Sequence, residues 1–212
     1  MPSLVERLNA RFHRDPFECA WRHDGLLADC GILYHGSDGW EDHELEFMPR
    51  ERRSMSASML YHAQYPIRTF GGSTRGLILR PGAVRILCGC GQDCGANCEP
   101  GIRKACEPAR DCRDERDTYC SNCAWQPGPA FGELFLRGKR QSEFGQGQDH
   151  YNEIVVDGGY WLDHMPDAVE AIVANEQVRD AFLRRYPEFK PHRSRDFPLV
   201  RLDLRNREAP FS

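Results

Sequence analysis

One carboxylate and one histidine stand out because each lies where a short apolar run meets a polar, glycine-containing segment. Glu153 comes immediately before the apolar residues 154–156, and His35 ends the run that starts at Ile32. A strand with a glutamate at its mouth is a rigid way to fix an acid group in a cleft. The simpler interpretation is that His35 lies in a turn with its hydrogen bonds satisfied and that Glu153 is a solvated edge residue. Together the two positions are the best functional lead in the chain.

A second group with chemical potential is a cluster of cysteines. Eight of the ten cysteines fall between positions 88 and 123, among Gly, Asp, Asn and Pro and without hydrophobic periodicity, so cross-links or metal must hold this segment. Disulfides fit this spacing best, and structural zinc is the alternative because Cys120 and Cys123 have metal-knuckle spacing. One such pair and no histidine within the cluster favour disulfides, and the role is structural in either case. The eight residues are Cys88, Cys90, Cys94, Cys98, Cys106, Cys112, Cys120 and Cys123.

The composition sets limits on domains, partners and location. With 212 residues, 40% of them hydrophobic and 28% charged, the chain is expected to form a single domain, 1–212, with a cysteine-rich insertion at about 88–123. A net charge of −4 gives no basic footprint for duplex nucleic acid. No apolar run is long enough for a membrane span, and the N-terminus lacks the core of a secretory signal. The compartment therefore stays open, although the cysteine cluster hints at an oxidising one.

The expected elements of the first half are mostly short. A helix should begin near Ser3, because Glu6 completes a capping box ahead of an apolar face. A strand is expected at 32–35, and 55–61 fits a helix or a strand equally well. Residues 77–79 and 84–87 are expected to pair as a hairpin around the Pro-Gly turn at 81–82.

The second half shows clearer patterns. Residues 153–156 predict a strand, 168–173 a helix opened by Pro166, and 176–186 a second helix stopped by Pro187. Residues 200–204 alternate as a half-buried strand does. The fold class is therefore α+β, with short-stranded mixed or antiparallel sheets, peripheral helices and a cysteine-rich stapled insertion.

Three short motifs, read together, resemble a known enzyme superfamily. Residues 33–37 (Leu-Tyr-His-Gly-Ser) and 151–157 (Tyr-Asn-Glu-Ile-Val-Val-Asp) resemble the first and last signature strands of the ADP-ribosyltransferase superfamily. The similarity is to the branch with a His-Tyr-Glu triad, which includes the poly- and mono-ADP-ribosyl polymerases. Residues 58–63 (Ser-Met-Leu-Tyr-His-Ala) are similar to its middle motif. The patches cover about a tenth of the chain, and Glu153 lies 118 residues after His35.

The resemblance implies a role for each matching residue, with NAD as cosubstrate. His35 would hydrogen-bond the adenosine ribose, and the backbone of Gly36 would bind the nicotinamide carboxamide. Tyr61 would stack on the nicotinamide ring. Glu153 would hold the 2′-hydroxyl of the nicotinamide ribose and stabilise the oxocarbenium-like sugar that forms as nicotinamide departs. Catalytic roles thus fall to Glu153, His35 and Tyr61.

The match departs from the family pattern at two places. Ser56-Ala57-Ser58 stands where the family has a glycine pair, and the cysteine-rich block interrupts the region before Glu153. Another branch uses arginine, a serine motif and glutamate, and Arg68 with Ser73-Thr74 fits that pattern, which makes Ser73 a further cofactor-binding candidate. Two hypotheses follow. One is an NAD-dependent ADP-ribosyltransferase-like domain with a protein or small molecule as acceptor, and the other is a non-enzymatic, disulfide-stapled binding module.

Overall fold

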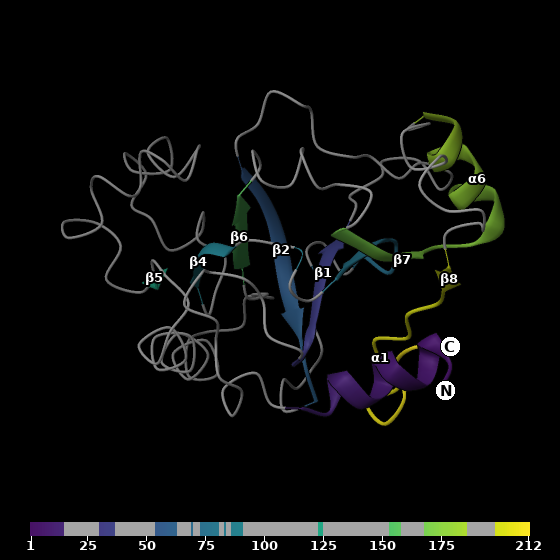
Figure 1. Ribbon diagram of the computed structural model, residues 1–212, viewed down its shortest axis with the longest axis horizontal. Helices are drawn as coiled ribbons and strands as arrows, with labels where there is room; N and C mark the ends of the chain where they lie inside the picture. Colours follow the sequence, from purple (N-terminus) through teal and green to yellow (C-terminus); the bar gives the residue numbers. More distant parts are fainter. Residues whose placement is uncertain are drawn as a thin grey trace.

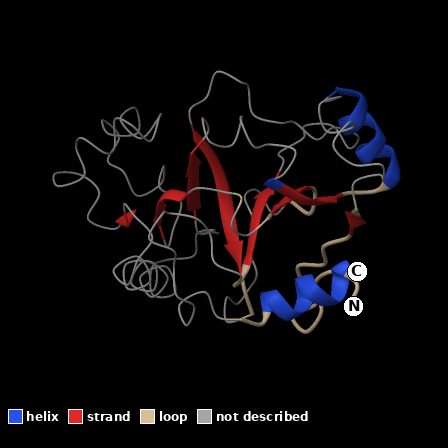
Figure 2. Ribbon diagram, in the orientation of Figure 1, coloured by secondary structure: helices blue, strands red, loops and turns tan. Residues whose placement is uncertain are grey.

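The computed structural model describes residues 1–14, 30–36, 54–62, 69, 73–80, 83, 86–90, 123–124, 153–157, 168–185 and 198–212. Within these residues, eight strands form one mixed sheet in the order β5-β4-β6-β2-β1-β3-β7-β8 (Figure 1). Two helices, α1 (Leu4–Phe12) and α6 (Glu176–Arg185), lie beside it (Figure 2). The α+β expectation is thus confirmed for this part of the chain.

The centre of the sheet is antiparallel. Strand β1 (Ile32–Gly36) pairs with β2 (Ser54–Leu60) on one side and with β3 (Gly76–Leu79) on the other. Beyond β2 lie β6 (Glu153–Asp157), β4 (Ile86–Cys90) and β5 (Cys123–Ala124). Beyond β3 lie β7 (Val169–Val173) and β8 (Leu199–Val200), and only the β7–β8 pair of these ladders is parallel.

Helix α1 forms as its sequence predicts. The Ser3 hydroxyl accepts a hydrogen bond from the Glu6 amide, and the Glu6 carboxylate accepts one from the Ser3 amide, which completes the capping box. These bonds hold the pKa of Glu6 below its usual value. The apolar face of the helix, with Leu8 and Phe12 fully buried, packs on the sheet.

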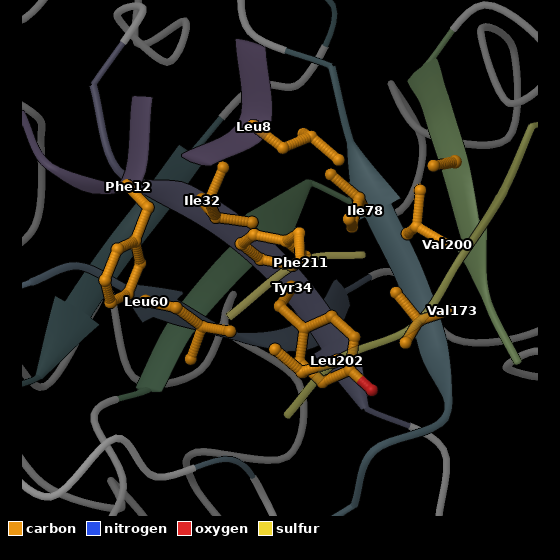
Figure 3. Packing of buried hydrophobic residues seen from close by; sticks show 11 residues of the cluster. Leu8, Phe12, Ile32, Tyr34, Leu60, Ile78, Val173, Val200, Leu202 and Phe211 are labelled. Carbon is orange, nitrogen blue, oxygen red and sulfur yellow. The ribbon is translucent and has the colours of Figure 1, made fainter. Parts of the chain in front are cut away.

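The core under α1 joins the two ends of the chain (Figure 3). Side chains from β1, β2, β3, β7 and β8 meet those of α1 and of the C-terminal residues 202–211 in one cluster. Burial of such a cluster is the main stabilising contribution to a domain of this size. Its members are Leu8, Phe12, Ile32, Tyr34, Leu60, Ile78, Ala171, Val173, Val200, Leu202 and Phe211.

The alternate residues of the central strands are buried as well. Leu33, Met59 and Leu77 each expose 1% or less of their surface, although they alternate with the residues of the cluster under α1. Both faces of the sheet centre are therefore covered. This fits the short apolar runs 32–34 of β1 and 77–79 of β3, whereas β2 carries serine at alternate positions.

Two sequence-based predictions of local structure are wrong. Residues 169–173, expected as part of a helix, form strand β7 between β3 and β8. The strand is almost entirely buried, so its sequence lacks the alternation that would have distinguished it from a buried helix. The expected hairpin of 77–79 with 84–87 is also absent, because β3 pairs with β1 and β7 while β4 pairs with β5 and β6.

Other predictions hold in the described residues. Strands are found at β1 and β6, and residues 55–60, left undecided by the sequence, belong to β2. Helix α6 begins after Asn175, whose side chain accepts a hydrogen bond from the Val178 amide. At the C-terminal end the burial alternates as predicted, with Val200 and Leu202 buried and Arg201 and Asp203 exposed. The expected strand 200–204 is wrong in extent, because β8 covers only Leu199–Val200 and Leu202 forms an isolated bridge with Phe211. Most of the cysteine-rich residues 88–123 lie outside the described residues.

Candidate functional site

The predicted His-Gly pair lies at the end of β1. His35 pairs with Leu77 and Gly36 with Gly76 on the neighbouring strand β3. The His35 side chain is only 8% exposed, so the surrounding side chains fix the position of its ring. The expectation that the pair ends a rigid strand is met.

The predicted carboxylate opens the strand on the other side of β2. Glu153 is the first residue of β6 and pairs with Cys90 of β4, and Ile154 pairs with Ala57 of β2. Ile154 is fully buried, which anchors the start of this strand in the core. The backbone of Glu153 therefore belongs to an interior strand of the sheet.

Strand β2 lies between these two positions. It pairs with β6 through residues 54–57 on one side and with β1 through residues 58–60 on the other. Continued by one residue, this register sets Glu153 level with Ser58 and Tyr34, one position from the level of His35, and the two positions therefore belong to opposite faces of the sheet. Two strand spacings separate β6 from β1, which corresponds to about 10 Å between the two backbones.

Tyr34 and Gly76 form the tightest packing beside His35. A Cβ added to Gly76 would lie 2.9 Å from the Tyr34 ring and would collide with the His35 carbonyl oxygen. The Tyr34 ring therefore covers the glycine backbone, and no larger residue fits at position 76 without displacing β1. The sequence carried a signal for this contact, since a glycine opens an otherwise apolar run and a tyrosine precedes the His-Gly pair, but the prediction missed it.

Ser73 lies in the turn that leads into β3. Its carbonyl oxygen accepts hydrogen bonds from the Tyr34 hydroxyl (3.3 Å) and from the Thr69 hydroxyl (2.7 Å). Its own hydroxyl donates to the Arg75 carbonyl at 2.9 Å. The turn places Ser73 near the His35–Gly36 end of the sheet, where its side chain shapes the local backbone.

Burial controls the ionisation of Tyr34. The side chain is fully buried, and this burial raises the pKa of its hydroxyl far above the usual value, against smaller opposing effects of the Ser73 hydrogen bond and the Arg75 charge. Tyr34 therefore stays neutral at physiological pH and acts as a hydrogen-bond donor to Ser73.

Tyr61 lies at the opposite end of the β1–β2 pair. Leu60 pairs with Ile32 at the beginning of β1, and Tyr61 follows it, several residues along the strand from His35. The side chain is 1% exposed, next to His62, whose amide donates to the Phe12 carbonyl of α1 at 2.9 Å. The structure thus brings His35, Gly36 and Ser73 to one end of β1, sets the Glu153 backbone level with Tyr34 in the middle of that strand, and leaves Tyr61 beyond its other end.

Comparison with known proteins adds no relative at this point. No family model, curated protein or solved structure matches the chain. The assignment of a function therefore depends on the residues and the fold alone.

The cysteines are described only in part. Among the eight clustered residues, the backbones of Cys88, Cys90 and Cys123 are described, and the other five lie outside the described residues. Cys30, which the sequence places well away from the cluster, is disulfide-bonded. The described residues contain no group of three or more His, Cys, Asp or Glu side chains placed to hold a metal ion.

The described helices can be compared with the expectation that the chain has no membrane span. Neither α1 nor α6 has the length and the apolar character that crossing a membrane requires.

Proposed function

We propose that this chain is an NAD-dependent ADP-ribosyltransferase-like domain in which Glu153 stabilises the transition state and His35 orients the cosubstrate. The observation that carries the proposal is the register of β2 with β1 on one side and β6 on the other, which sets Glu153 one position from the level of His35. Two motif residues 118 positions apart in sequence thereby come within about 10 Å in backbone position.

The chemistry requires one well-placed carboxylate. The bond between the nicotinamide nitrogen and C1′ of the ribose breaks, and nicotinamide leaves with the bonding electron pair, which neutralises its ring. The sugar is left with oxocarbenium-like positive charge. Glu153 would stabilise that charge and hold the 2′-hydroxyl, and water or an acceptor nucleophile would then attack C1′ and lose a proton.

The parts around His35 suit a binding role. Its burial and the close contact of Tyr34, Gly76 and the His35 backbone give the end of β1 a fixed geometry, which preorganises a ribose contact. Gly36 would offer backbone groups to the nicotinamide carboxamide. Because Tyr61 is buried and lies away from His35, we assign it to packing in the interior, and its stacking on nicotinamide stays an untested prediction.

The cysteine-rich residues 88–123 would form a stapled insertion in this domain, with disulfides as the proposed links and zinc as the alternative. The acceptor of the ADP-ribose is a protein or a small molecule. The competing function is a non-enzymatic binding module. The two functions differ in whether the chain turns over NAD.

The experiment measures nicotinamide release from NAD by the full chain, separated by liquid chromatography. Glu153→Gln should lower kcat by on the order of 100- to 1000-fold, because it removes the charge and keeps the shape of the side chain. Asp157→Asn is the matched control, since Asp157 ends the same strand and pairs with Ser54 at the far side. The control should stay within about twofold of the wild type.

Two outcomes would reject the enzyme. One is a wild-type rate equal to the spontaneous hydrolysis of NAD, and the other is a Glu153→Gln variant as active as the wild type. Calorimetric titration with NAD separates the parts of the proposal, because loss of catalysis with NAD binding retained identifies Glu153 as the group that acts on the transition state.

A further inference from the structure

Two cysteines lie directly opposite each other in the ladder at the edge of the sheet. Cys90, the last residue of β4, pairs with Cys123, the first residue of β5, and Gly89 pairs with Ala124. On its other side, Cys90 pairs with Glu153 of β6. One row of the sheet thus runs through Cys123, Cys90 and Glu153.

The spacing of antiparallel strands fits a covalent bond between these two cysteines. Directly opposed residues have their Cα atoms about 4.5 to 5.5 Å apart, which lies within the roughly 4.4 to 6.8 Å that a disulfide spans. Cys88 stands two residues along β4 and pairs with Val155. Its distance to Cys123 is that of a diagonal pair, about 7 to 8 Å, which is too long. The register therefore selects Cys90 over Cys88.

The short length of β5 also favours a covalent link between Cys90 and Cys123. With two residues, β5 has two ladder positions to hold it on β4, and pairing of this length is marginal without a further constraint. Cys30 elsewhere in the sheet region is disulfide-bonded, so oxidised cysteine is part of this structure.

We propose that Cys90 and Cys123 form a cross-strand disulfide that fastens β5 to β4 beside the first residue of β6. The two thiols lose two protons and two electrons as the S–S bond forms. The electrons pass to an external disulfide, such as oxidised glutathione, which is reduced to two thiols by exchange through a mixed disulfide. Fixing this pair reduces the 105 connectivities that eight cysteines allow to the 15 of the remaining six.

The disulfide has a consequence for the proposed catalytic residue, and this consequence rests on the proposed function. A fixed β4–β5 edge holds the strand position next to Glu153, so the disulfide would position the carboxylate without contacting the substrate. Reduction of the wild type should then lower kcat with little change in KM. The Cys90→Ser variant should show the lowered kcat without any reductant.

The pairing itself is tested without NAD. Unreduced protein is denatured in the presence of iodoacetamide and digested with trypsin, and tandem mass spectrometry locates the labelled cysteines in peptides 86–103 and 117–137. In the wild type, Cys90 and Cys123 should be labelled only after reduction. Cys90→Ser should expose Cys123 to labelling without reduction, and Cys123→Ser should expose Cys90. Cys88→Ser is the matched control and should leave both protected.

Each other outcome overturns the pairing. Cys123 that stays protected in the Cys90→Ser variant, or label that appears at Cys120 in its place, assigns a different partner. Labelling of both residues after chelation alone, with release of one zinc ion per chain, replaces the disulfide with a thiolate metal site. These readings hold whether or not the protein turns over NAD, so failure of the disulfide and failure of the enzyme are distinguishable.

Discussion

At the scale of single residues, Tyr34 links the core to the candidate site. Its ring packs against Gly76 beside the His35 backbone, and its hydroxyl donates to the Ser73 carbonyl from a fully buried position. The residue before the His-Gly pair therefore fixes the end of β1 from within the core. A substitution at Tyr34 should therefore change the stability of the fold more than it changes any ligand contact.

The raised pKa of Tyr34 predicts a pH effect on stability. In the unfolded chain a tyrosine ionises at about pH 10, whereas the folded chain keeps the Tyr34 proton because burial raises the pKa. The stabilising contribution is therefore fully present below about pH 10 and falls by about 1.4 kcal/mol per pH unit above it. Tyr34→Phe removes this dependence and costs about 1 kcal/mol at neutral pH through the lost hydrogen bond.

Urea unfolding of the wild type and Tyr34→Phe between about pH 7 and pH 11 measures this difference. The stability advantage of the wild type should shrink, and then reverse, as the pH rises through the unfolded-state pKa of tyrosine. A difference that stays constant across this range would show that Tyr34 ionises normally in the folded chain.

The sequence predicted part of the candidate site correctly at this scale. His35 and Glu153 were placed at strand ends because each stands at the boundary of a short apolar run, and this local pattern is readable without the fold. The partners that surround them were not readable. Gly76 and Cys90 reach His35 and Glu153 only through strand pairing, which joins residues distant in the sequence.

At the scale of elements, one buried ion pair ties α1 to the far strand of the central sheet. Arg11 Nη1 lies 2.8 Å from Glu170 Oε2 of β7, and the side chains are 7% and 13% exposed. The Arg11 Nε also donates to the Gly31 carbonyl, just before β1, at 2.9 Å. One arginine thus connects the helix to two strands. Because the pair is shielded from water, removing one partner leaves a poorly compensated charge.

Replacing Glu170 tests the importance of this connection. Glu170→Gln should lower the free energy of unfolding by about 3 kcal/mol, because Arg11 keeps its charge in a buried position. The matched control is Asp180→Asn in the pair of Asp180 with Arg179, which spans 3.0 Å on the surface of α6 with Asp180 52% exposed. The control should cost less than about 1 kcal/mol in urea unfolding. Equal effects of the two variants would mean that the helix docks on the sheet without the ion pair.

The wrong prediction of a helix at 168–173 is explained by how the elements pair. Residues 169–173 carry Glu170 among four apolar residues, a pattern that a short amphipathic helix shares. Pairing with β3 and β8 makes residues 169–173 a strand. The intrinsic conformational preference of so short a run is a weak predictor by comparison. Helix α1 was predicted correctly from its capping box and apolar face, and α6 from its periodic apolar residues and the proline that follows it in the sequence.

At the scale of the whole molecule, the C-terminal residues close the structure onto its N-terminal helix. The two chain ends lie side by side (Figure 1). Asn9 of α1 donates to the Phe211 carbonyl at 2.9 Å and accepts from the Phe211 amide at 3.1 Å. The backbones of Arg201 and Ser212 exchange two further hydrogen bonds. The contact of Asn9 with Phe211 was not predictable from the sequence, since residues 202 positions apart leave no local pattern.

The strand order also depends on contacts between residues that are distant in the sequence. Residues 77–79 and 84–87 were expected to pair because a Pro-Gly turn lies between them, yet β3 and β4 belong to opposite halves of the sheet. A turn signal shows that the chain reverses or changes direction, and it does not show which strand it meets next. The order of the eight described strands is a property of the assembled molecule.

The last prediction concerns this closure. Phe211 is 1% exposed and packs edge-on against Phe12, with ring centroids 6.4 Å apart. Phe211→Ala should therefore lower the free energy of unfolding by about 3 to 5 kcal/mol in urea, because it leaves a cavity where α1 meets the sheet. Arg205→Ala is the control, as Arg205 lies in the same C-terminal segment with an exposed side chain, and it should change stability by less than about 0.5 kcal/mol. If Phe211→Ala were no more destabilising than Arg205→Ala, the C-terminal segment would rest on the core without completing it, and the domain would be defined by the strands alone.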